Sequence, residues 1–241
     1  MIRPMKDKVF SETRSLRPFE FNQEVADVFD DMLVRSIPFY EEVHRIILDM
    51  VDKLVPENGL VYDLGCSTGT TIELIDKSNQ DKELSFIGID LSEPMVEKAR
   101  QKLTGMNNVE LLASDLTKYE FESADFVIMN YTLQFIDKFE RAKLLSKICR
   151  ALKPGGILFM AEKINCEHES LHEIFTDLYY DFKRRNGYSE LEISQKREAL
   201  ENVLTPLTPT AQIELMKYAG FDSVDMPFRW YNFASFVGVK K

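Results

Sequence analysis

The sequence predicts an α/β fold in which a mostly parallel sheet is covered by helices on both faces. From residue 60 onward, short apolar runs alternate with amphipathic helical patterns; the runs are LVYDLG, LSFIGIDL, VELLASD, ADFVIMNYTL and GILFMAEK. Strands that are buried on both faces and separated by helices are typical of parallel sheets. The length of 241 residues suits one domain with a substantial core, so we expect residues 1–241 to form a single domain.

The segments on either side of this alternation predict additions to the sheet. Residues 22–33 and 38–55 carry apolar residues at helical spacing and predict an N-terminal helical cap within residues 1–56, with Pro38 in a first turn. Residues 167–204 hold two helical patterns with no strand between them, which predicts a helical insert above the strand ends. A helix ended by Gly220 and an antiparallel closing pair of strands complete the chain.

Charge and composition argue against several classes of function. The net charge of −10 and the pI near 5.0 disfavour tight, direct binding of nucleic acid. Three cysteines without C-x-x-C spacing and only three histidines predict neither a disulfide framework nor a metal site. No apolar run has the length of a transmembrane segment, and the N-terminus does not resemble a signal peptide. We therefore expect a cytoplasmic protein without membrane contact.

The loop GCSTG, Gly65 to Gly69, fits two incompatible kinds of site. It matches the G-x-S-x-G pattern of a hydrolase nucleophile elbow, in which Ser67 would attack a carbonyl carbon. Such a site needs an acid and then a histidine later in the chain, in a loop after a late strand. No histidine follows His172, and His168 lies four residues before it on a helical stretch. The hydrolase interpretation is therefore the weaker one.

The same loop also fits the first turn of a Rossmann-like cofactor site. Its glycines let a ligand approach the backbone, and unpaired amides at the start of the next helix can face polar ligand atoms. Ser67 and Thr70 stand where the pyrophosphate-binding pattern G-x-G-x-x-G has glycines, so a ligand without pyrophosphate fits better. S-adenosyl-L-methionine is such a ligand. In this interpretation Cys66 is a small buried residue and not a nucleophile.

Acids and an amide stand at the ends of the following strands. Asp90 ends FIGID and can accept hydrogen bonds from ribose hydroxyls. Asp90 could instead cap the next helix, although Ser92 is the better cap. Asp115 follows the third strand, where it suits an adenine amino group, and Asn130 ends the fourth, beside the expected substrate. Asp63, in the first strand, could orient the loop or approach the ligand's ammonium through water.

Longer strings in the chain resemble one family. They are SIPFY, DLGCS, GIDLSEPMVEKAR, MNYTLQF, LKPGGILFMAEK and DFKRRNGYSELEISQKREALENVL, of which GYSELEISQKR is the most specific. From about Phe10 to the C-terminus the chain is similar to the carboxy-S-adenosyl-L-methionine synthase family. The resemblance implies a Rossmann-like class I methyltransferase fold and a transferase that converts S-adenosyl-L-methionine and prephenate to carboxy-S-adenosyl-L-methionine and phenylpyruvate. It also implies a homodimer whose product passes to a separate enzyme that modifies a wobble uridine in tRNA.

The resemblance also implies which residues contact the cofactor, with Tyr40 and Arg197 as the residues that act in the reaction. The implied contacts are Tyr40, Gly65, Cys66, Ser67, Asp90, Leu91, Asp115, Leu116, Asn130 and Arg197. The family often has Asn where this chain has Leu91, so a backbone contact is expected there in place of a side-chain bond. Phe39, and the pair Tyr179 and Tyr180 where the family often has two histidines, are further departures.

Arg197 has two interpretations. QKREALEN is helical, so Arg197 could pair with Glu201 one turn later on an exposed face. Alternatively, its guanidinium could hold the carboxylate of the product through two parallel charge-assisted bonds, which an ordinary methyltransferase does not need. Tyr40 is similarly either a buried aromatic anchor or a hydroxyl in the site. Charge alone suggests Arg197, Arg14 or Arg184 as anchors for prephenate.

Two other classes of function remain open at this point. The first is an ordinary small-molecule methyltransferase, although NYTL stands where methyltransferases of planar amides and bases carry D/N-P-P-Y. The second is a non-catalytic sensor of the cofactor, or a scaffold for the enzyme that acts on tRNA.

Overall fold

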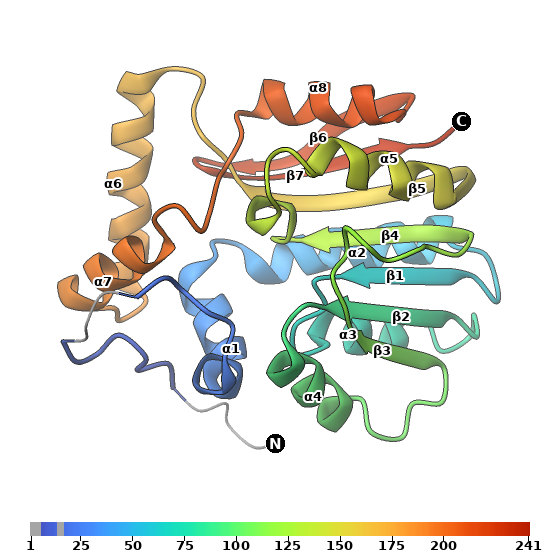
Figure 1. Ribbon diagram of the computed structural model, residues 1–241, viewed down its shortest axis with the longest axis horizontal. Coiled ribbons are helices and arrows are strands. Elements are labelled where there is room, and N and C mark those ends of the chain that lie inside the picture. The colour runs from blue at the N-terminus through green and yellow to red at the C-terminus, as the bar shows by residue number, and fades with distance from the viewer. Residues whose placement is uncertain (1–5, 14–16) are drawn as a thin grey trace.

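The computed structural model describes residues 6–13 and 17–241, and within them a seven-stranded sheet has the order β3-β2-β1-β4-β5-β7-β6 (Figure 1). Five strands run parallel, and β7 pairs antiparallel with both β5 and β6. The predicted class I methyltransferase sheet with an antiparallel final strand is therefore confirmed. The strands are β1 Leu60–Leu64, β2 Ser85–Asp90, β3 Val109–Ala113, β4 Ala124–Asn130, β5 Leu152–Lys163, β6 Ser223–Trp230 and β7 Phe233–Val239.

Helices cover both faces of this sheet and bury an apolar cluster on each. Successive side chains of a strand point to opposite faces, so Tyr62 and Leu64 join one cluster while Val61 joins the other. α5 and α8 complete the first cluster, and α2 and α3 complete the second. The sheet-covering helices, with the 3-10 helix η1, are α2 Tyr40–Leu54, α3 Thr70–Ser78, α4 Glu93–Lys102, η1 Leu133–Phe135, α5 Arg141–Ala151 and α8 Pro209–Ala219. No helix in the described part of the chain is long and apolar enough to cross a membrane.

The N-terminal helix α1 (Gln23–Ser36) begins at a cap formed by Asn22, whose side chain accepts a hydrogen bond from Val25 N at 3.1 Å. The prediction that Pro38 lies in the first turn of the next helix is wrong. α2 begins at Tyr40, and Phe39 forms its cap in the left-handed conformation with φ 55°. Only three residues connect α1 to α2, so the chain must turn sharply, and it does so at Phe39 rather than in a helical turn.

The helical insert consists of α6 (Glu169–Arg185) and α7 (Glu190–Leu200), with no strand between them, as the pattern predicts. Ser189 and Glu192 form a reciprocal capping box that starts α7. The insert is fastened to α1, because Tyr179 donates from its hydroxyl to the Ser36 carbonyl at 3.0 Å. In Figure 1, α1, α6 and α7 lie together beyond the carboxyl ends of the parallel strands.

Candidate active site

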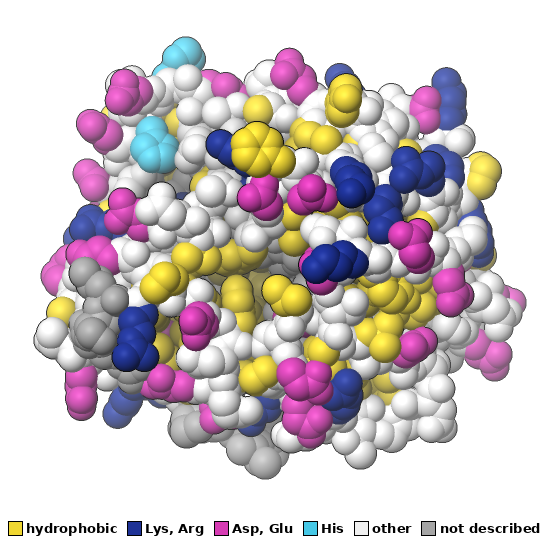
Figure 2. Space-filling view, viewed as in Figure 1, with side chains coloured by type: hydrophobic (Ala, Val, Ile, Leu, Met, Phe, Trp, Pro, Cys, Tyr) yellow, Lys and Arg dark blue, Asp and Glu magenta, His cyan; other side chains and the backbone are white. Residues whose placement is uncertain are grey.

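A cavity of about 270 Å³ lies between the carboxyl ends of the parallel strands and the N-terminal and inserted helices. Hydrophobic side chains gather in the hollow near the centre of the face that Figure 2 shows. Nine of the ten residues that the resemblance implies line this cavity. They are Tyr40, Gly65, Cys66, Ser67, Asp90, Leu91, Asp115, Leu116 and Asn130. The fold thus brings residues from four strand ends and α2 to one place, whereas their contact with a ligand stays a prediction.

The loop after β1 is shaped by glycine at its two ends. Gly65 has φ 80°, and a Cβ added there would lie 2.2 Å from Thr132 Oγ1. Thr132 is held in that position because its hydroxyl donates to the Leu64 carbonyl at 2.8 Å. Gly69 has φ 77° and caps α3 in the left-handed conformation. Any larger residue at position 65 would therefore combine an unfavourable backbone conformation with a direct steric clash.

Asp90 holds the loop from the neighbouring strand. Its Oδ2 accepts a hydrogen bond from Ser67 N at 3.0 Å, and its Oδ1 accepts one from Ser92 N at 2.9 Å. Ser92 is the residue that caps α4, through a bond from Met95 N to Ser92 Oγ at 3.3 Å, so the better predicted cap is the one observed. Burial raises the pKa of Asp90, while these backbone bonds oppose the rise. The carboxylate is thus fixed at the cavity wall with lone pairs left for ligand hydroxyls.

Asp63, in β1, and Cys66, within the loop, are both buried. Asp63 Oδ2 has no hydrogen-bond partner among the described residues. Burial, together with the charge of Asp90, raises the pKa of Asp63 to about 7. Burial also raises the pKa of the Cys66 thiol well above its usual value. A thiol that resists ionisation is a poor nucleophile, so Cys66 is a small buried residue of the loop, as the sequence predicts.

Asp115 and Asn130 bring oxygen acceptors to the cavity wall, where Asp115 Oδ2 also pairs with Lys118 Nζ at 3.0 Å. Asp115 Oδ1 accepts hydrogen bonds from Thr117 N and Thr117 Oγ1 at 3.0 and 2.7 Å, and these bonds lower its pKa. Asn130 Oδ1 is buried at the end of β4 and has no partner among the described residues. A buried amide oxygen without a donor is costly unless a ligand supplies one. Asn130 therefore fits a ligand that carries an N–H or O–H group.

Tyr40 reaches the cavity from the first turn of α2. Its ring packs edge-to-face on His44, with the ring centroids 4.4 Å apart. Burial raises the pKa of the Tyr40 hydroxyl, so this group remains a neutral donor at physiological pH. His44 Nδ1 lies 3.0 Å from the Tyr40 carbonyl oxygen, and its Nε2 lies 3.2 Å from Thr71 Oγ1. These contacts give His44 a positioning role for Tyr40.

A network of polar side chains ties α1 to the ligand loop. Asp30, in α1, accepts a hydrogen bond from Thr68 Oγ1 at 2.6 Å. Lys102 Nζ lies 2.7 Å from Asp30 Oδ2 and donates to Thr70 Oγ1 at 2.6 Å. Thr68 and Thr70 flank Gly69, so this network connects the N-terminal helix directly to the loop. The helical cap is therefore part of the site rather than an appendage.

The geometry around Ser67 argues against the hydrolase interpretation. Ser67 Oγ donates to the Gly65 carbonyl at 3.4 Å and also interacts with the Asp90 carboxylate. His44 is engaged with Tyr40 and Thr71, while His168 and His172 belong to the start of α6. No described histidine contacts Ser67, so the hydroxyl has no general base.

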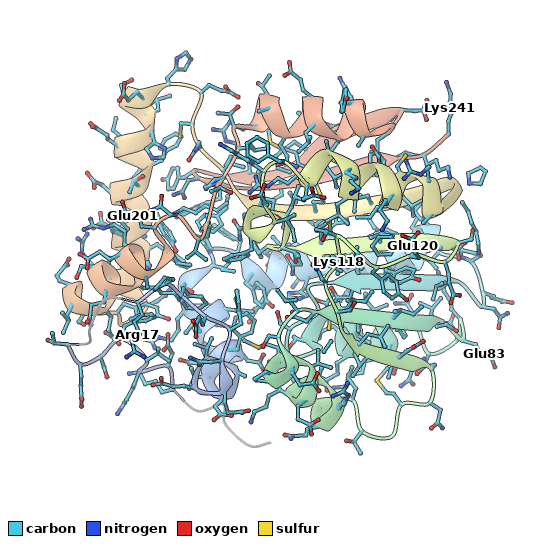
Figure 3. All side chains as sticks on the ribbon, viewed as in Figure 1. Arg17, Glu83, Lys118, Glu120, Glu201 and Lys241 are labelled. Carbon is cyan, nitrogen blue, oxygen red and sulfur yellow. The ribbon has the colours of Figure 1, made fainter. Side chains whose placement is uncertain are left out.

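Arg197 does not line the cavity of its own chain. Its side chain is 59% exposed, and the nearest acidic atom is Glu198 Oε1 at 3.9 Å. The predicted pair with Glu201 is absent too, because α7 ends at Leu200 and Glu201 lies beyond it on the flank of the molecule (Figure 3). Neighbouring helical positions point about 100° apart, so Lys196 faces the cavity while Arg197 faces outward. Within its own chain, Arg197 is therefore not placed in the wall of this cavity.

The described residues give no support for Arg184 or Arg14 as anchors for prephenate. Arg184 is exposed and bound to Asp181 and Glu190 at 2.6 and 2.5 Å. Arg14 lies outside the described residues. Several residues that line the cavity are absent from the sequence prediction, among them Phe19, Phe21, Tyr131, Phe135, Lys163 and Lys196. Lys163 ends the strand GILFMAEK at the same sheet edge as Asn130, which is a signal that could have identified it.

The fold and the cavity define a class I methyltransferase-fold protein, and the comparisons with known proteins agree. The family profile described as "Methyltransferase domain" matches residues 61–156. An O-methyltransferase family protein from Burkholderia thailandensis superposes with a TM-score of 0.68 at 18% identity, over 92% of this chain and 61% of that chain. Human N-acetylserotonin methyltransferase in complex with SAM superposes with a TM-score of 0.63 at 17% identity, over 90% of this chain and 55% of that chain.

Curated relatives extend over nearly the whole chain. The carboxy-S-adenosyl-L-methionine synthase of Nautilia profundicola is 45% identical over 98% of this chain and 100% of its own length. That of Desulfotalea psychrophila is 42% identical over 98% of this chain and 97% of its own length. The chain therefore belongs to the carboxy-S-adenosyl-L-methionine synthase family, a family of transferases that use S-adenosyl-L-methionine.

Proposed function

We propose that the protein is a carboxyl transferase that converts S-adenosyl-L-methionine and prephenate to carboxy-S-adenosyl-L-methionine and phenylpyruvate. One observation carries the proposal. The similarity to relatives named for this activity covers not only the common methyltransferase domain but also the N-terminal helices and the insert. Those two additions supply Tyr40 and Lys196 and close the cavity over the strand ends.

The walls near the strand ends suit S-adenosyl-L-methionine, which is a substrate of this reaction. Asp90 has free lone pairs for the ribose hydroxyls, and Asp115 for the adenine amino group. The buried oxygen of Asn130 needs a donor, which the ammonium or a hydroxyl of the ligand would supply. Gly65 leaves room for the ligand beside the backbone.

The proposed reaction balances without a further reactant. Prephenate loses its ring carboxylate as carbon dioxide and its ring hydroxyl as hydroxide, and the ring becomes aromatic. The hydroxide removes one proton from the methyl group on sulfur and leaves as water. The resulting carbanion forms a carbon–carbon bond to the carbon dioxide. The chain's own contribution is confinement and exclusion of water, for which the aromatic lining of Phe21, Tyr131 and Phe135 is suited.

The proposal extends to partners and place of action. We propose a homodimer in which Arg197 of one copy reaches the cavity of the other and pairs with the carboxylate of the product. Exposed apolar side chains on α1 and the insert, such as Val34, Ile174 and Leu191, offer surface for such contact. In this proposal the product passes to a separate tRNA-modifying enzyme in the cytoplasm. The net charge of −10 is consistent with a protein that does not itself bind RNA.

The test is an incubation of the purified protein with prephenate and isotope-labelled S-adenosyl-L-methionine, followed by mass spectrometry. We expect a labelled product heavier than the starting compound by one carbon dioxide unit, together with phenylpyruvate. A methylated acceptor with S-adenosylhomocysteine would instead identify an ordinary methyltransferase. Steady turnover without a protein partner excludes a sensor or scaffold.

A further inference from the structure

Three lysine side chains gather where the helical insert meets the end of β5. Lys163 is the last residue of β5, Lys183 lies in α6 and Lys196 lies in α7. Lys183 and Lys196 are only 4% and 7% exposed. Lys163 and Lys196 line the cavity, whereas Lys183 does not. Two lysines from separate elements therefore belong to the wall of the ligand space.

Two tyrosine rings lie between the three ammonium groups. Lys163 Nζ lies 5.3 Å and Lys183 Nζ 5.4 Å from the centroid of the Tyr179 ring. Lys183 Nζ and Lys196 Nζ each lie 5.7 Å from the centroid of the Tyr188 ring. Such cation–π contacts are weak beside an ion pair and leave the positive charge in place. The rings therefore hold the cations near one another without neutralising them.

The described residues provide no ion pair for this cluster. The acids that most affect it, Asp7 and Glu192, are engaged with other donors. Asp7 Oδ2 accepts from the Tyr188 hydroxyl at 2.7 Å, and Glu192 Oε2 accepts from Ser189 N at 2.7 Å. Burial lowers the pKa of all three lysines, which is the expected response of a cation without a counter-charge. An anion entering the cavity would supply the missing charge.

We propose that Lys163 and Lys196 form the anion subsite for the carboxyl donor and hold the carboxylate that the donor keeps throughout the reaction. This inference rests on the proposed function, in which prephenate carries two carboxylates. The two lysines reach the cavity wall from β5 and α7, so together they give this side of the cavity a positive charge that attracts a carboxylate. Lys196 Nζ also donates to Ser36 Oγ at 3.3 Å, which fixes its direction.

The chemistry selects one of the two carboxylates. The ring carboxylate leaves as neutral carbon dioxide, so its charge disappears during the reaction. A buried ammonium paired with it would stabilise the ground state more than the transition state and would slow the step. The pyruvyl carboxylate keeps its charge in both prephenate and phenylpyruvate. An ammonium can therefore hold it from binding to release without opposing the reaction.

The test compares Lys163→Met and Lys196→Met with the wild-type protein. We expect each change to raise the KM for prephenate and the Kd for phenylpyruvate by roughly 30-fold or more. The Kd for S-adenosyl-L-methionine should change by less than about threefold, because its wall is separate. Calorimetry gives both Kd values, and the mass-spectrometric assay gives KM. Lys196→Arg should restore most of the phenylpyruvate affinity, since it returns the positive charge.

Lys82→Met is the matched control. Lys82 is also largely buried, with Nζ donating to the Val55 carbonyl at 3.1 Å, but it does not line the cavity. Its loss should leave all three constants unchanged. A higher KM for prephenate with unchanged phenylpyruvate binding would mean that the lysines hold the ring carboxylate, and would overturn the inference. Unchanged constants in both Met variants would overturn it as well.

Two further measurements distinguish a failure of the proposed function from a failure of the anion subsite. If wild-type protein binds phenylpyruvate but never carboxylates S-adenosyl-L-methionine, the proposed function fails and the inference falls with it. Removal of a buried charge is expected to leave the melting temperature unchanged or higher. If a Met variant melts lower and loses S-adenosyl-L-methionine binding, Lys163→Arg and Lys196→Arg decide the question. Arg variants that fold but bind phenylpyruvate no better than the Met variants would refute the subsite.

Discussion

The two walls of the cavity carry opposite charge. The wall formed by the strand ends presents Asp90, Asp115 and the amide oxygen of Asn130. The wall formed by the end of β5 and the insert presents Lys163 and Lys196. S-adenosyl-L-methionine carries a positive sulfonium, whereas prephenate is a dianion. A cavity polarised in this way can bind the two side by side and disfavour the reversed arrangement.

The walls also differ in how their polar groups are held. Both oxygens of Asp90 are fixed by backbone amides of Ser67 and Ser92, so that wall is arranged before a ligand binds. Lys163 and Lys196 form no ion pair among the described residues, and Asp7 compensates the charge of Lys196 only in part, so an anion in the cavity would add to that compensation. One wall is therefore preorganised by the sheet, while the charge balance of the other wall depends on its ligand.

Gly65→Ala should have the largest effect, because it disturbs the wall formed by the strand ends. The added Cβ would lie 2.2 Å from Thr132 Oγ1, and φ is 80°. We expect the affinity for S-adenosyl-L-methionine to fall by about 100-fold or more, because the loop must shift into the ligand space. Calorimetry measures this loss, and phenylpyruvate binding should persist if the two walls act separately.

Gly155→Ala separates backbone strain from the clash at Gly65. Gly155 has a similar φ of 78°, but a Cβ added there would meet nothing within 4 Å. Both changes incur the strain of a left-handed alanine, of about 1 kcal/mol, which denaturant unfolding measures. Only Gly65→Ala should lose ligand binding. Equal ligand affinity in the two variants would contradict the assignment of Gly65 to the binding wall.

An intermediate effect is expected from a pH titration, which tests the wall formed by the end of β5 and the insert. Burial, the largest cause, lowers the pKa of Lys196 to about 8 from its usual value. The ammonium is therefore charged below about pH 8 and neutral above it, and only the charged form pairs with a carboxylate. We expect phenylpyruvate affinity to be constant below pH 8 and to fall above it, by up to about tenfold per pH unit. Calorimetry from pH 6.5 to pH 9.5 measures the profile.

Other charged or titratable groups face Lys196 from every element packed around it. They are Asp7 in the N-terminal arm, Arg35 in α1, Lys183 in α6, Tyr188 before α7 and, through Lys183, Lys163 at the end of β5. Lys196→Arg is the control, because a guanidinium stays charged over the whole range. A fall in affinity at the same pH in that variant would assign the titration to a different member of the cluster.

The sequence predicts the wall formed by the strand ends, but not the wall formed by the end of β5 and the insert. Carboxyl ends of parallel strands meet at one edge of a sheet, so Asp90, Asp115 and Asn130 could be placed together without knowledge of the helices. α7 offers no such rule, because its buried side chains include the polar residues Glu192, Gln195 and Lys196. Hydrophobic periodicity cannot identify the inward face of a helix that buries polar groups. The resemblance implied Arg197, whereas no pattern in the sequence pointed to Lys196, which the structure places in the cavity wall.

Arg197→Leu should have the smallest effect on a single chain. It tests whether a neighbouring copy adds its Arg197 to the cavity. The guanidinium is 59% exposed with only a distant contact to Glu198, so stability and the Kd for S-adenosyl-L-methionine should not change measurably. If a neighbouring copy uses Arg197, the Kd for carboxy-S-adenosyl-L-methionine should rise alone, and only at concentrations where sedimentation shows a dimer. Unchanged affinity for both ligands in the dimer would contradict the proposal that Arg197 of a neighbouring copy pairs with the carboxylate of the product. A loss of plain S-adenosyl-L-methionine binding would contradict both assignments, because no atom of Arg197 lines that wall within its own chain.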